Sequence, residues 1–340
     1  MSDRSGKLLV SVVVPAHNAE NTIELCLKAL FNQSLPREEY EVIVVDDGST
    51  DGTAEVVRKF PEARLFRQER QGPAAARNLG AYQARGEIIL FTDADCQPTS
   101  EWAERLAAPL REGAGVVGAK GTYLTRQQEL IARFVQLEYE EKYERMAGEK
   151  YVDFIDTYSA AYRREVFLQA GGFDTRFPTA SVEDQEFSFR LAAQGYKMVF
   201  VPEARVYHRH ASSLKDYLRR KFRIGYWKVM VHRRHPKKIL RDSHTPQTLK
   251  FQIILAFGLV FSFLASLLWP SLLWGALACG VAFLLSTFPF SLKALRKDFL
   301  IGLLSSFLLL LRALSLGVGF GTGILGEQFL YKNIKVGKRQ

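Results

Sequence analysis

Short apolar runs alternate with helical patterns through roughly the first 200 residues of the chain. Apolar runs bounded by turn residues predict strands, and apolar positions spaced three or four apart predict helices. The expected strands lie at residues 8–14, 40–46, 63–67 and 87–93, and the expected helices at 20–33, 51–60, 72–85 and 100–111. This alternation predicts βαβ units and a mostly parallel sheet, and hence an α/β domain that we place at residues 1–211.

Three of the expected strands end in polar residues. The first ends in PAHN (15–18), the second in DDGSTDGT (46–53) and the fourth in DAD (93–95). Each segment alone is ordinary turn chemistry. Ligands of parallel sheets bind beyond the carboxyl ends of the strands, so three polar ends together favour a binding site there. The pair Asp93 and Asp95 suits Mg²⁺ or Mn²⁺, hard cations that share their coordination with substrate phosphates.

A long uncharged run follows in the second half of the chain. Residues 251–292 include 42 consecutive uncharged residues, whereas one bilayer span needs about 20 apolar residues. The run therefore has room for two spans, at about 251–269 and 272–291. The alternative, buried core helices of a soluble protein, fits poorly with a run of this length.

A third apolar segment occupies about 299–325 and contains Arg312, a charge that is costly in a bilayer unless it faces protein or water. A complete third span would export the basic tail at 332–340, against the positive-inside tendency. We therefore expect this segment to be re-entrant or to lie in the interface, within a membrane region at 251–331. Its glycine-rich end favours close helix packing.

The positive charge of the chain is concentrated in one block. The net charge is +10, yet the stretch from Arg205 to Lys250 alone holds 14 Lys or Arg and two acids. Such a block suggests nucleic acid, anionic lipid or a phosphorylated ligand, and the apolar run beside it favours membrane lipids and argues against nucleic acid. Residues 212–250 resemble an interfacial amphipathic helix. A positive-inside anchor without a ligand role explains them equally well.

The cysteines and the N-terminus bear on location. Cys26, Cys96 and Cys279 have no metal-binding spacing and form no disulfide framework, which fits a reducing compartment. The N-terminal segment before the first apolar run is short and polar, so no secretory signal is apparent. We expect an integral membrane protein whose first domain lies on the cytoplasmic face of the cell membrane.

Six motifs carry a family resemblance. SVVVPAHN, VVDDGSTDGT, GPAAARNLGA, FTDADCQP, GGFD and VEDQEFSFRL resemble, in this order and spacing, the family-2 glycosyltransferases with a GT-A type nucleotide-diphosphosugar domain. The resemblance covers roughly residues 8–210. It implies a Rossmann-like catalytic domain, here followed by membrane helices, and a membrane-anchored inverting transferase acting in cell-envelope polysaccharide synthesis. The donor would be a nucleotide diphosphosugar and the acceptor a hydroxyl of a lipid-linked glycan or glycolipid.

The resemblance also implies roles for matching residues. Asp184 would be the general base, Asp95 the ligand of Mg²⁺ or Mn²⁺, and His208, favoured over His210, would close the metal shell. Asp93 would lie near both ribose and metal. The residues implied in nucleotide-sugar binding are Pro15, His17, Asn18, Asp46, Asp47, Arg77, Asp93 and Glu183.

This chain departs from the family pattern at two places. His17 stands where tyrosine is more usual, so a ring is kept but its hydrogen bonding changes. The frequent Q-x-x-R-W motif is absent, and RRKFRIGYW (219–227) stands roughly in its place. Arg219, Arg220 and Arg223 are therefore candidates for contact with the diphosphate.

Other functions remain open. A phosphate acceptor is already a nucleophilic anion, whereas a sugar hydroxyl needs a base such as Asp184, so we favour the hydroxyl. A polyprenyl-phosphate glycosyltransferase is the nearest alternative. A sugar nucleotidylyltransferase would require a glycine-rich phosphate-binding loop after the first strand, and the segment there, PAHNAEN, contains no glycine. A non-catalytic, membrane-bound nucleotide-sugar binding module fits poorly with retention of DAD and VED.

Overall fold

The computed structural model of the protein forms two compact units. The residues it describes are 8–113, 115–177, 182–239, 242–243 and 245–336. The first unit runs to Arg126 and resumes at Tyr143–His210. The second consists of Gln127–Lys142 and the described residues from Ala211 onward. The basic tail expected at 332–340 extends beyond the described residues.

The first unit is built on one eight-stranded sheet with the order β3-β2-β1-β4-β7-β6-β8-β5. Its strands are β1 (Val10–Ala16), β2 (Tyr40–Asp47), β3 (Ala63–Gln68), β4 (Ile88–Phe91), β5 (Gln97–Pro98), β6 (Val116–Leu124), β7 (Ala160–Arg163) and β8 (Lys197–Tyr207). β1, β2, β3 and β4 are parallel to one another and are joined by βαβ connections. β7 then runs antiparallel to β4 and β6, while β8 runs parallel to β6. The predicted α/β fold is confirmed, with a mixed second half.

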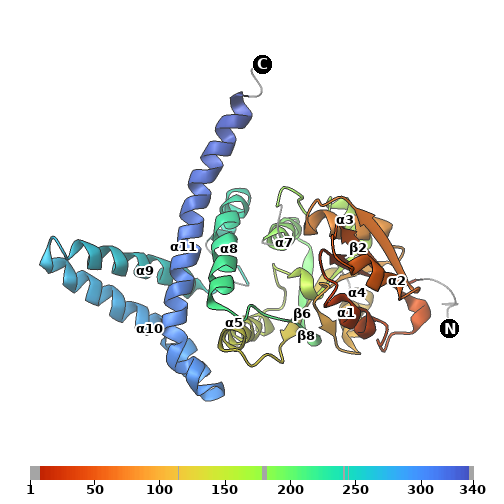
Figure 1. Ribbon diagram of the computed structural model, residues 1–340, viewed down its shortest axis with the longest axis horizontal. Helices are drawn as coiled ribbons and strands as arrows, with labels where there is room; N and C mark the ends of the chain where they lie inside the picture. The colour runs from red at the N-terminus through yellow and green to blue at the C-terminus, as the bar shows by residue number, and fades with distance from the viewer. Residues whose placement is uncertain (1–7, 114, 178–181, 240–241, 244, 337–340) are drawn as a thin grey trace. The chain divides into compact units, whose positions relative to one another are not determined.

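Helices cover this sheet in the order that the sequence predicts (Figure 1). They are α1 (Ile23–Leu30), α2 (Thr53–Arg58), α3 (Pro73–Gln83), α4 (Trp102–Glu112), α6 (Arg164–Gln169) and α7 (Glu183–Ala193), with 3₁₀ turns η1 (Arg37–Glu39) and η2 (Thr157–Ser159). α5 (Leu130–Ala147) contributes only its last turn to this unit. α3 packs tightly on β1 at Gly80, which lacks a side chain: a Cβ there would lie 2.3 Å from Cγ1 of Val13.

The second unit is helical. Besides most of α5 it contains α8 (Leu214–Arg234), η3 (Pro236–Ile239), α9 (Gln247–Ala265), η4 (Pro270–Leu272), α10 (Leu273–Lys297) and α11 (Phe299–Val336). Three segments are long and apolar enough to cross a membrane: Thr248–Ala265, Pro270–Lys297 and Phe299–Gly326. They match the three apolar segments expected from the sequence, and α11 continues as a helix to Val336.

α8 and α11 lie side by side with their backbones almost in contact (Figure 1). A Cβ on Gly225 of α8 would lie 2.3 Å from the carbonyl oxygen of Leu316. A Cβ on Gly319 of α11 would lie 2.1 Å from the carbonyl oxygen of Phe222. The glycines of α11 thus allow close helix packing. The apolar face of α8, which includes the buried Val231, packs on protein, whereas Arg219 and Arg223 lie on its exposed face.

Arg312, the charge within the third apolar segment, faces protein. Its guanidinium donates to Oε1 of Glu138 at 2.7 Å and to Oε1 of Gln252 at 2.6 Å. The other carboxylate oxygen of Glu138 accepts from Lys221 Nζ and Tyr217 Oη, both at 3.0 Å. Burial by itself raises the pKa of Glu138, but Lys221 and Arg312 outweigh it and lower the pKa to about 2. We call these five side chains the Glu138 cluster.

Candidate active site

The polar ends of β1 and β2 are hydrogen-bonded to each other. The register pairs the last residue of β1 with Asp46. Nδ1 of His17 lies 2.9 Å from the carbonyl oxygen of Asp47. Asn18 adopts a left-handed φ of 50° and donates its N–H to Oγ of Ser49 at 2.9 Å. The predicted segments PAHN and DDGST therefore form one surface, with Pro15 as the penultimate residue of β1.

Asp46 and Asp47 are both buried and hold the loops around that surface. Oδ1 of Asp46 accepts from the N–H of Ser49 at 2.9 Å, and its Oδ2 lies 2.8 Å from Nε of Arg67. The carboxylate of Asp47 accepts the N–H groups of residues 71–72, both at 2.8 Å. Asp47 thus fixes the chain just before α3.

α3 carries Arg77 into the interior between two acids. Arg77 is 3% exposed. It donates to Oδ1 of Asp93 at 2.7 Å and to Oε1 of Glu183 at 3.0 Å. Burial acts to lower the pKa of Arg77, but the two carboxylates outweigh it and raise the pKa. Arg77 therefore ties the segment after β4 to the start of α7.

Asp184 follows Glu183 in the first turn of α7. Its Oδ1 accepts from the N–H of Gln185 at 2.8 Å, and its Oδ2 from the N–H of Thr157 at 3.4 Å. Burial, and then the charge of Glu183, raise the pKa of Asp184 to about 7, although Arg77 opposes the shift. A carboxyl group with such a pKa can exchange a proton near neutral pH.

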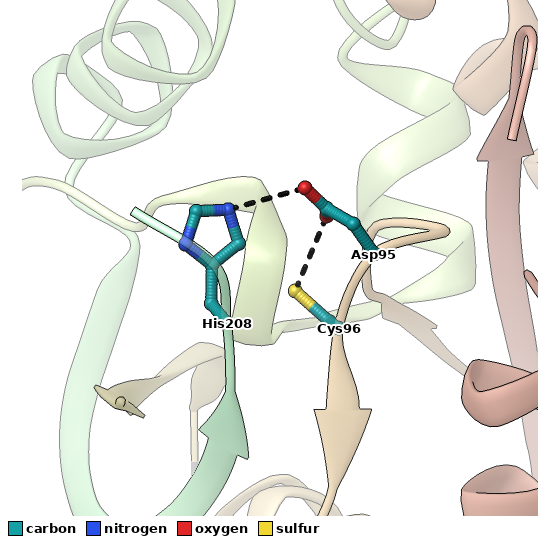
Figure 2. A group of neighbouring side chains, drawn as sticks. All are labelled: Asp95, Cys96 and His208. Atoms are coloured by element: carbon teal, nitrogen blue, oxygen red, sulfur yellow. Dashed lines mark hydrogen bonds and ion pairs between the residues drawn. The ribbon is translucent and has the colours of Figure 1, made fainter. Parts of the chain in front are cut away.

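Strand pairing brings the DAD segment to the end of β8. β5 begins directly after Cys96 and pairs antiparallel with β8, so that Gln97 lies opposite Tyr207. Oδ2 of Asp95 lies 3.5 Å from Nε2 of His208, and Oδ1 lies 3.9 Å from Sγ of Cys96 (Figure 2). Asp95, Cys96 and His208 each offer a ligand atom within 4.8 Å of the others.

His208 is held in this orientation by neighbouring rings. Its ring stacks on Tyr123, with centroids 4.4 Å apart. Its Nδ1 lies 3.3 Å from Nδ1 of His210, which is buried behind it. These contacts leave Nε2 directed at Asp95 (Figure 2). Partners of this kind orient histidine ligands in metal sites.

Comparison with known proteins decides the family. Residues 11–170 match the family model described as "Glycosyl transferase family 2". Glycosyltransferase AglE of Haloferax volcanii is 30% identical over 232 residues, which cover 65% of this chain and 73% of that protein.

The chain belongs to glycosyltransferase family 2.

Two further similarities complete the comparison. A Methanococcus voltae protein is 23% identical over 66% of this chain and 74% of its own. Its name is dolichyl N-acetyl-α-D-glucosaminyl phosphate 3-β-D-2,3-diacetamido-2,3-dideoxy-β-D-glucuronosyltransferase. The solved structure "Mannosyltransferase PcManGT from Pyrobaculum calidifontis in complex with GDP-Man and Mn2+" has a TM-score of 0.59 and 23% identity, covering 94% of this chain and 88% of that one. The fold of the first unit is the GT-A type expected for a family-2 glycosyltransferase.

The structure brings the predicted residues of this family-2 enzyme together in three groups. The ends of β1 and β2 form one group; Arg77, Asp93, Glu183 and Asp184 form the second; Asp95 and His208 form the third. Their assigned roles stay predictions. Arg219, Arg220 and Arg223 lie on α8 in the second unit, and their contact with a diphosphate also stays a prediction.

Asn78 is a positioning residue that the sequence reasoning missed. Its side-chain amide donates to the carbonyl oxygen of Phe173 at 2.8 Å and accepts the N–H of the same residue at 2.9 Å. Gly172, with a φ of 64°, packs so close that a Cβ would lie 2.6 Å from Oδ1 of Asn78. The ARN and GGFD motifs are thus one structural unit, and their co-occurrence was the available signal.

Lys120 is a second missed residue. It lies on β6, is fully buried, and forms an ion pair with Asp156. Burial lowers the pKa of Lys120 to about 7, and the nearby charge of Asp184 opposes the shift. A lysine inside the apolar run VVGAKGTYL was the signal that could have identified it. The residue following Asp156, Thr157, donates its N–H to Asp184, so this ion pair borders the predicted base.

Proposed function

We propose that this family-2 enzyme is an inverting glycosyltransferase that moves a sugar from a nucleotide diphosphosugar to a hydroxyl of a lipid-linked glycan or glycolipid. Asp184 is the general base, and Asp95 with His208 holds a divalent cation. The ends of β1 and β2 bind the nucleotide. The catalytic unit lies on the cytoplasmic face of the membrane, anchored by the apolar helices of the second unit.

The hydrogen bonding and the raised pKa of Asp184 are the main support for the proposal. A sugar hydroxyl is a poor nucleophile, so its transfer needs a base positioned at the acceptor. Each oxygen of Asp184 accepts one backbone N–H, at 2.8 Å and 3.4 Å, which orients the carboxylate while leaving lone pairs for a hydroxyl. Its raised pKa, about 7, makes it a stronger base than an exposed aspartate, about half ionised at neutral pH and largely ionised at mildly alkaline pH.

The proton transfer defines the reaction. Asp184 accepts the proton of the acceptor hydroxyl as that oxygen attacks the anomeric carbon. The bond from the anomeric carbon to the nucleoside diphosphate breaks on the opposite side of the sugar, so the configuration inverts. Glu183 remains paired with Arg77 at 3.0 Å. It therefore positions Arg77, whereas its neighbour Asp184 accepts the proton.

The residues that follow β4 and β8 fit a divalent cation. Asp95 is 42% exposed at its side chain, whereas the imidazole of His208 is 8% exposed and oriented toward it. Asp95 and His208 would hold the ion, with oxygen atoms of the diphosphate completing its shell. Such an ion supplies charge stabilisation to the departing diphosphate. PcManGT, which shares the fold, was solved with Mn²⁺.

The acceptor assignment rests on two supports. A phosphate acceptor is already anionic and would not need the half-buried base that Asp184 provides. The M. voltae relative is named for transfer to dolichyl N-acetylglucosaminyl phosphate, a lipid-linked sugar. The apolar helices α9, α10 and α11 would bring the catalytic unit to such a substrate, and the basic face of α8 favours the cytoplasmic leaflet.

The test uses the full chain in detergent. Nucleoside diphosphates are screened with Mn²⁺ for thermal stabilisation, because a ligand at 100 times its Kd adds about 2.7 kcal/mol to the folded state. The matching nucleotide sugar is then assayed with hydroxyl and phosphate acceptors. Asp184→Asn is expected to lower the transfer rate to hydroxyls by about 10²–10⁴-fold with donor binding retained. Near-normal transfer by this variant would remove Asp184 as the base.

Controls separate the alternatives. Glu101→Gln changes an exposed acid that pairs with Arg105 on the surface, and it should leave transfer unchanged. Transfer to a polyprenyl phosphate that is insensitive to Asp184→Asn would favour the phosphate-acceptor enzyme. Failure of every donor to release nucleoside diphosphate, with Mn²⁺ or Mg²⁺ and at pH values above 7, would favour the binding module.

A further inference from the structure

Cys96 shares the proposed cation site with Asp95 and His208. Its thiol is fully buried, and Sγ lies 3.9 Å from Oδ1 of Asp95. The ligand atoms of all three residues lie within 4.8 Å of one another. A tetrahedral ion with bonds of about 2.0–2.3 Å separates its ligand atoms by about 3.3–3.6 Å. Shifts of about an ångström or less would therefore bring the three atoms onto one ion.

The local fold accounts for the position of the thiol. The N–H of Cys96 donates to the carbonyl oxygen of Asp93 at 3.0 Å, which closes the DAD turn. The pairing of β5 with β8 then places the residue beside His208 (Figure 2). Cys26 lies at the same turn, but its Sγ contacts the carbonyl oxygen of Asp93 at 3.5 Å and it is not a member of the group. Cys26 is therefore a matched control for Cys96, because both thiols are buried near the same turn and only Cys96 belongs to the group.

We infer that Asp95, Cys96 and His208 form a second coordination mode of this site, which takes a borderline-soft cation such as Zn²⁺, Co²⁺ or Cd²⁺ through the sulfur of Cys96. The inference rests on the proposed function only in sharing Asp95 and His208. As the sulfur–metal bond forms, the thiol proton leaves to solvent, and no electron is transferred. A water molecule or a diphosphate oxygen supplies the fourth ligand.

The nature of the cation decides which mode is used. Mg²⁺ and Mn²⁺ prefer oxygen ligands and bind without the sulfur of Cys96. Zn²⁺ and Cd²⁺ bind thiolate strongly enough to displace the thiol proton. They are expected to replace the hard ion and to inhibit transfer, since a closed tetrahedral shell leaves fewer positions for diphosphate.

The decisive measurement is a titration of the full chain in detergent with Co²⁺. Coordination by sulfur gives a sulfur-to-cobalt charge-transfer band in the near ultraviolet that oxygen and nitrogen ligands do not give. The band is expected in the wild type, in Cys26→Ser and in Cys279→Ser, and is expected to be absent in Cys96→Ser. Since the chain has three cysteines, these variants assign the band completely.

Affinity provides the second readout. Cys96→Ser is expected to weaken Zn²⁺ binding by at least about 100-fold, because loss of a mere second-shell partner costs roughly 10–100-fold. Mn²⁺ binding, followed by electron paramagnetic resonance, should stay within about threefold in the same variant, since Mn²⁺ prefers oxygen ligands. Circular dichroism checks that Cys96→Ser folds, and Cys96→Ala replaces it where it does not.

The outcomes separate this inference from the proposed function. A wild-type protein that binds Co²⁺ without the sulfur band, or whose band survives Cys96→Ser, overturns the inference and leaves the Asp95–His208 site standing. A wild-type protein that binds neither Co²⁺ nor Mn²⁺ overturns both. Retention of Zn²⁺ affinity in Cys96→Ser likewise overturns the inference, whatever the enzyme's activity.

Discussion

Each unit of the protein buries an arginine where several elements meet, and the two arginines are paired differently. Arg77 joins α3 to two acids, Asp93 and Glu183. Arg312 joins α11 to one acid, Glu138, which also accepts from a second cation, Lys221. The cluster in the catalytic unit therefore has an excess of negative charge, and the cluster in the helical unit has an excess of positive charge.

The difference follows from what each unit has to do. The surplus acids of the first unit lie near Asp184, the proposed base, and Asp95, the proposed cation ligand. In the second unit, the charges hold together helices from distant parts of the chain, and Lys221 keeps 15% of its side chain exposed. In both clusters one residue carries the minority charge: Arg77 in the first and Glu138 in the second.

Removing the minority charge of the catalytic unit should have the largest effect. Arg77→Met leaves Asp93 and Glu183 without their shared cation, and breaking a buried pair in this way costs about 3–5 kcal/mol. Thermal or urea unfolding of the purified protein, followed by a signal from the first unit, measures the loss. Arg58→Met, which breaks an exposed i,i+3 pair, serves as the control. Equal stability of the two variants would show that the Arg77 cluster is not essential.

The acid surplus should also be visible in the pH dependence of turnover. Asp184 must be ionised to accept a proton, and its pKa is raised to about 7. The transfer rate is expected to fall by about tenfold for each pH unit below 7 and to level off above it. Glu183→Gln removes a charge that raises the pKa of Asp184, so the fall should move to lower pH.

The same shift has an opposite sign for stability. The folded protein keeps the proton of Asp184 to higher pH than the unfolded chain, whose aspartates have their usual pKa near 3.8. Its contribution to stability is therefore present at acid pH and is lost as the pH rises toward 7. Asp184→Asn should abolish this component of the pH dependence of the unfolding temperature.

A wild-type transfer rate that stays constant from pH 5 to 8 would contradict the raised pKa of Asp184.

Local patterns were sufficient for much of this picture. Strands, helices and the residues at strand ends follow from apolar periodicity and turn chemistry, which depend on neighbours in the sequence. The pairing of Arg312 with Glu138 does not, because 174 residues separate them. The sequence showed a costly charge in an apolar segment and predicted that it faces protein or water, but it contained no sign of which residue would satisfy it.

The neighbourhood of Cys96 shows a second limit of sequence reasoning. Its contact with Asp95 and His208 depends on β5, a strand of two residues that no periodicity can reveal. The glycines of α11 are an intermediate case. Their spacing predicted close packing, whereas the choice of α8 as partner came only from the structure. Simple sequence patterns therefore do not predict which residues far apart in the chain will contact one another.

Removing the minority charge of the helical unit should have a smaller effect than in the catalytic unit. Glu138→Gln leaves Arg312 and Lys221 as two cations, but Lys221 can turn toward water, so we expect a loss of about 1.5–3 kcal/mol. Unfolding of the protein in mixed micelles measures it. Glu140→Gln on the same helix breaks an exposed pair with Lys297 and should change stability by less than about 1 kcal/mol. A loss larger than that of Arg77→Met would reverse the comparison.

The smallest effect concerns packing without charge in the helical unit. Gly319→Ala would place a Cβ 2.1 Å from the carbonyl oxygen of Phe222, so α8 and α11 must separate, at a cost of about 1–3 kcal/mol. Gly321 lies two residues along the same helix, with nothing within 4 Å of the corresponding Cβ. Gly321→Ala should therefore stabilise the helix by up to about 1 kcal/mol, through its better helix propensity. Opposite signs from one chemical change, measured by unfolding in micelles, would show that contact with α8, and not helix propensity, requires glycine at 319. Equal effects would mean that α8 and α11 do not pack this closely in the folded protein.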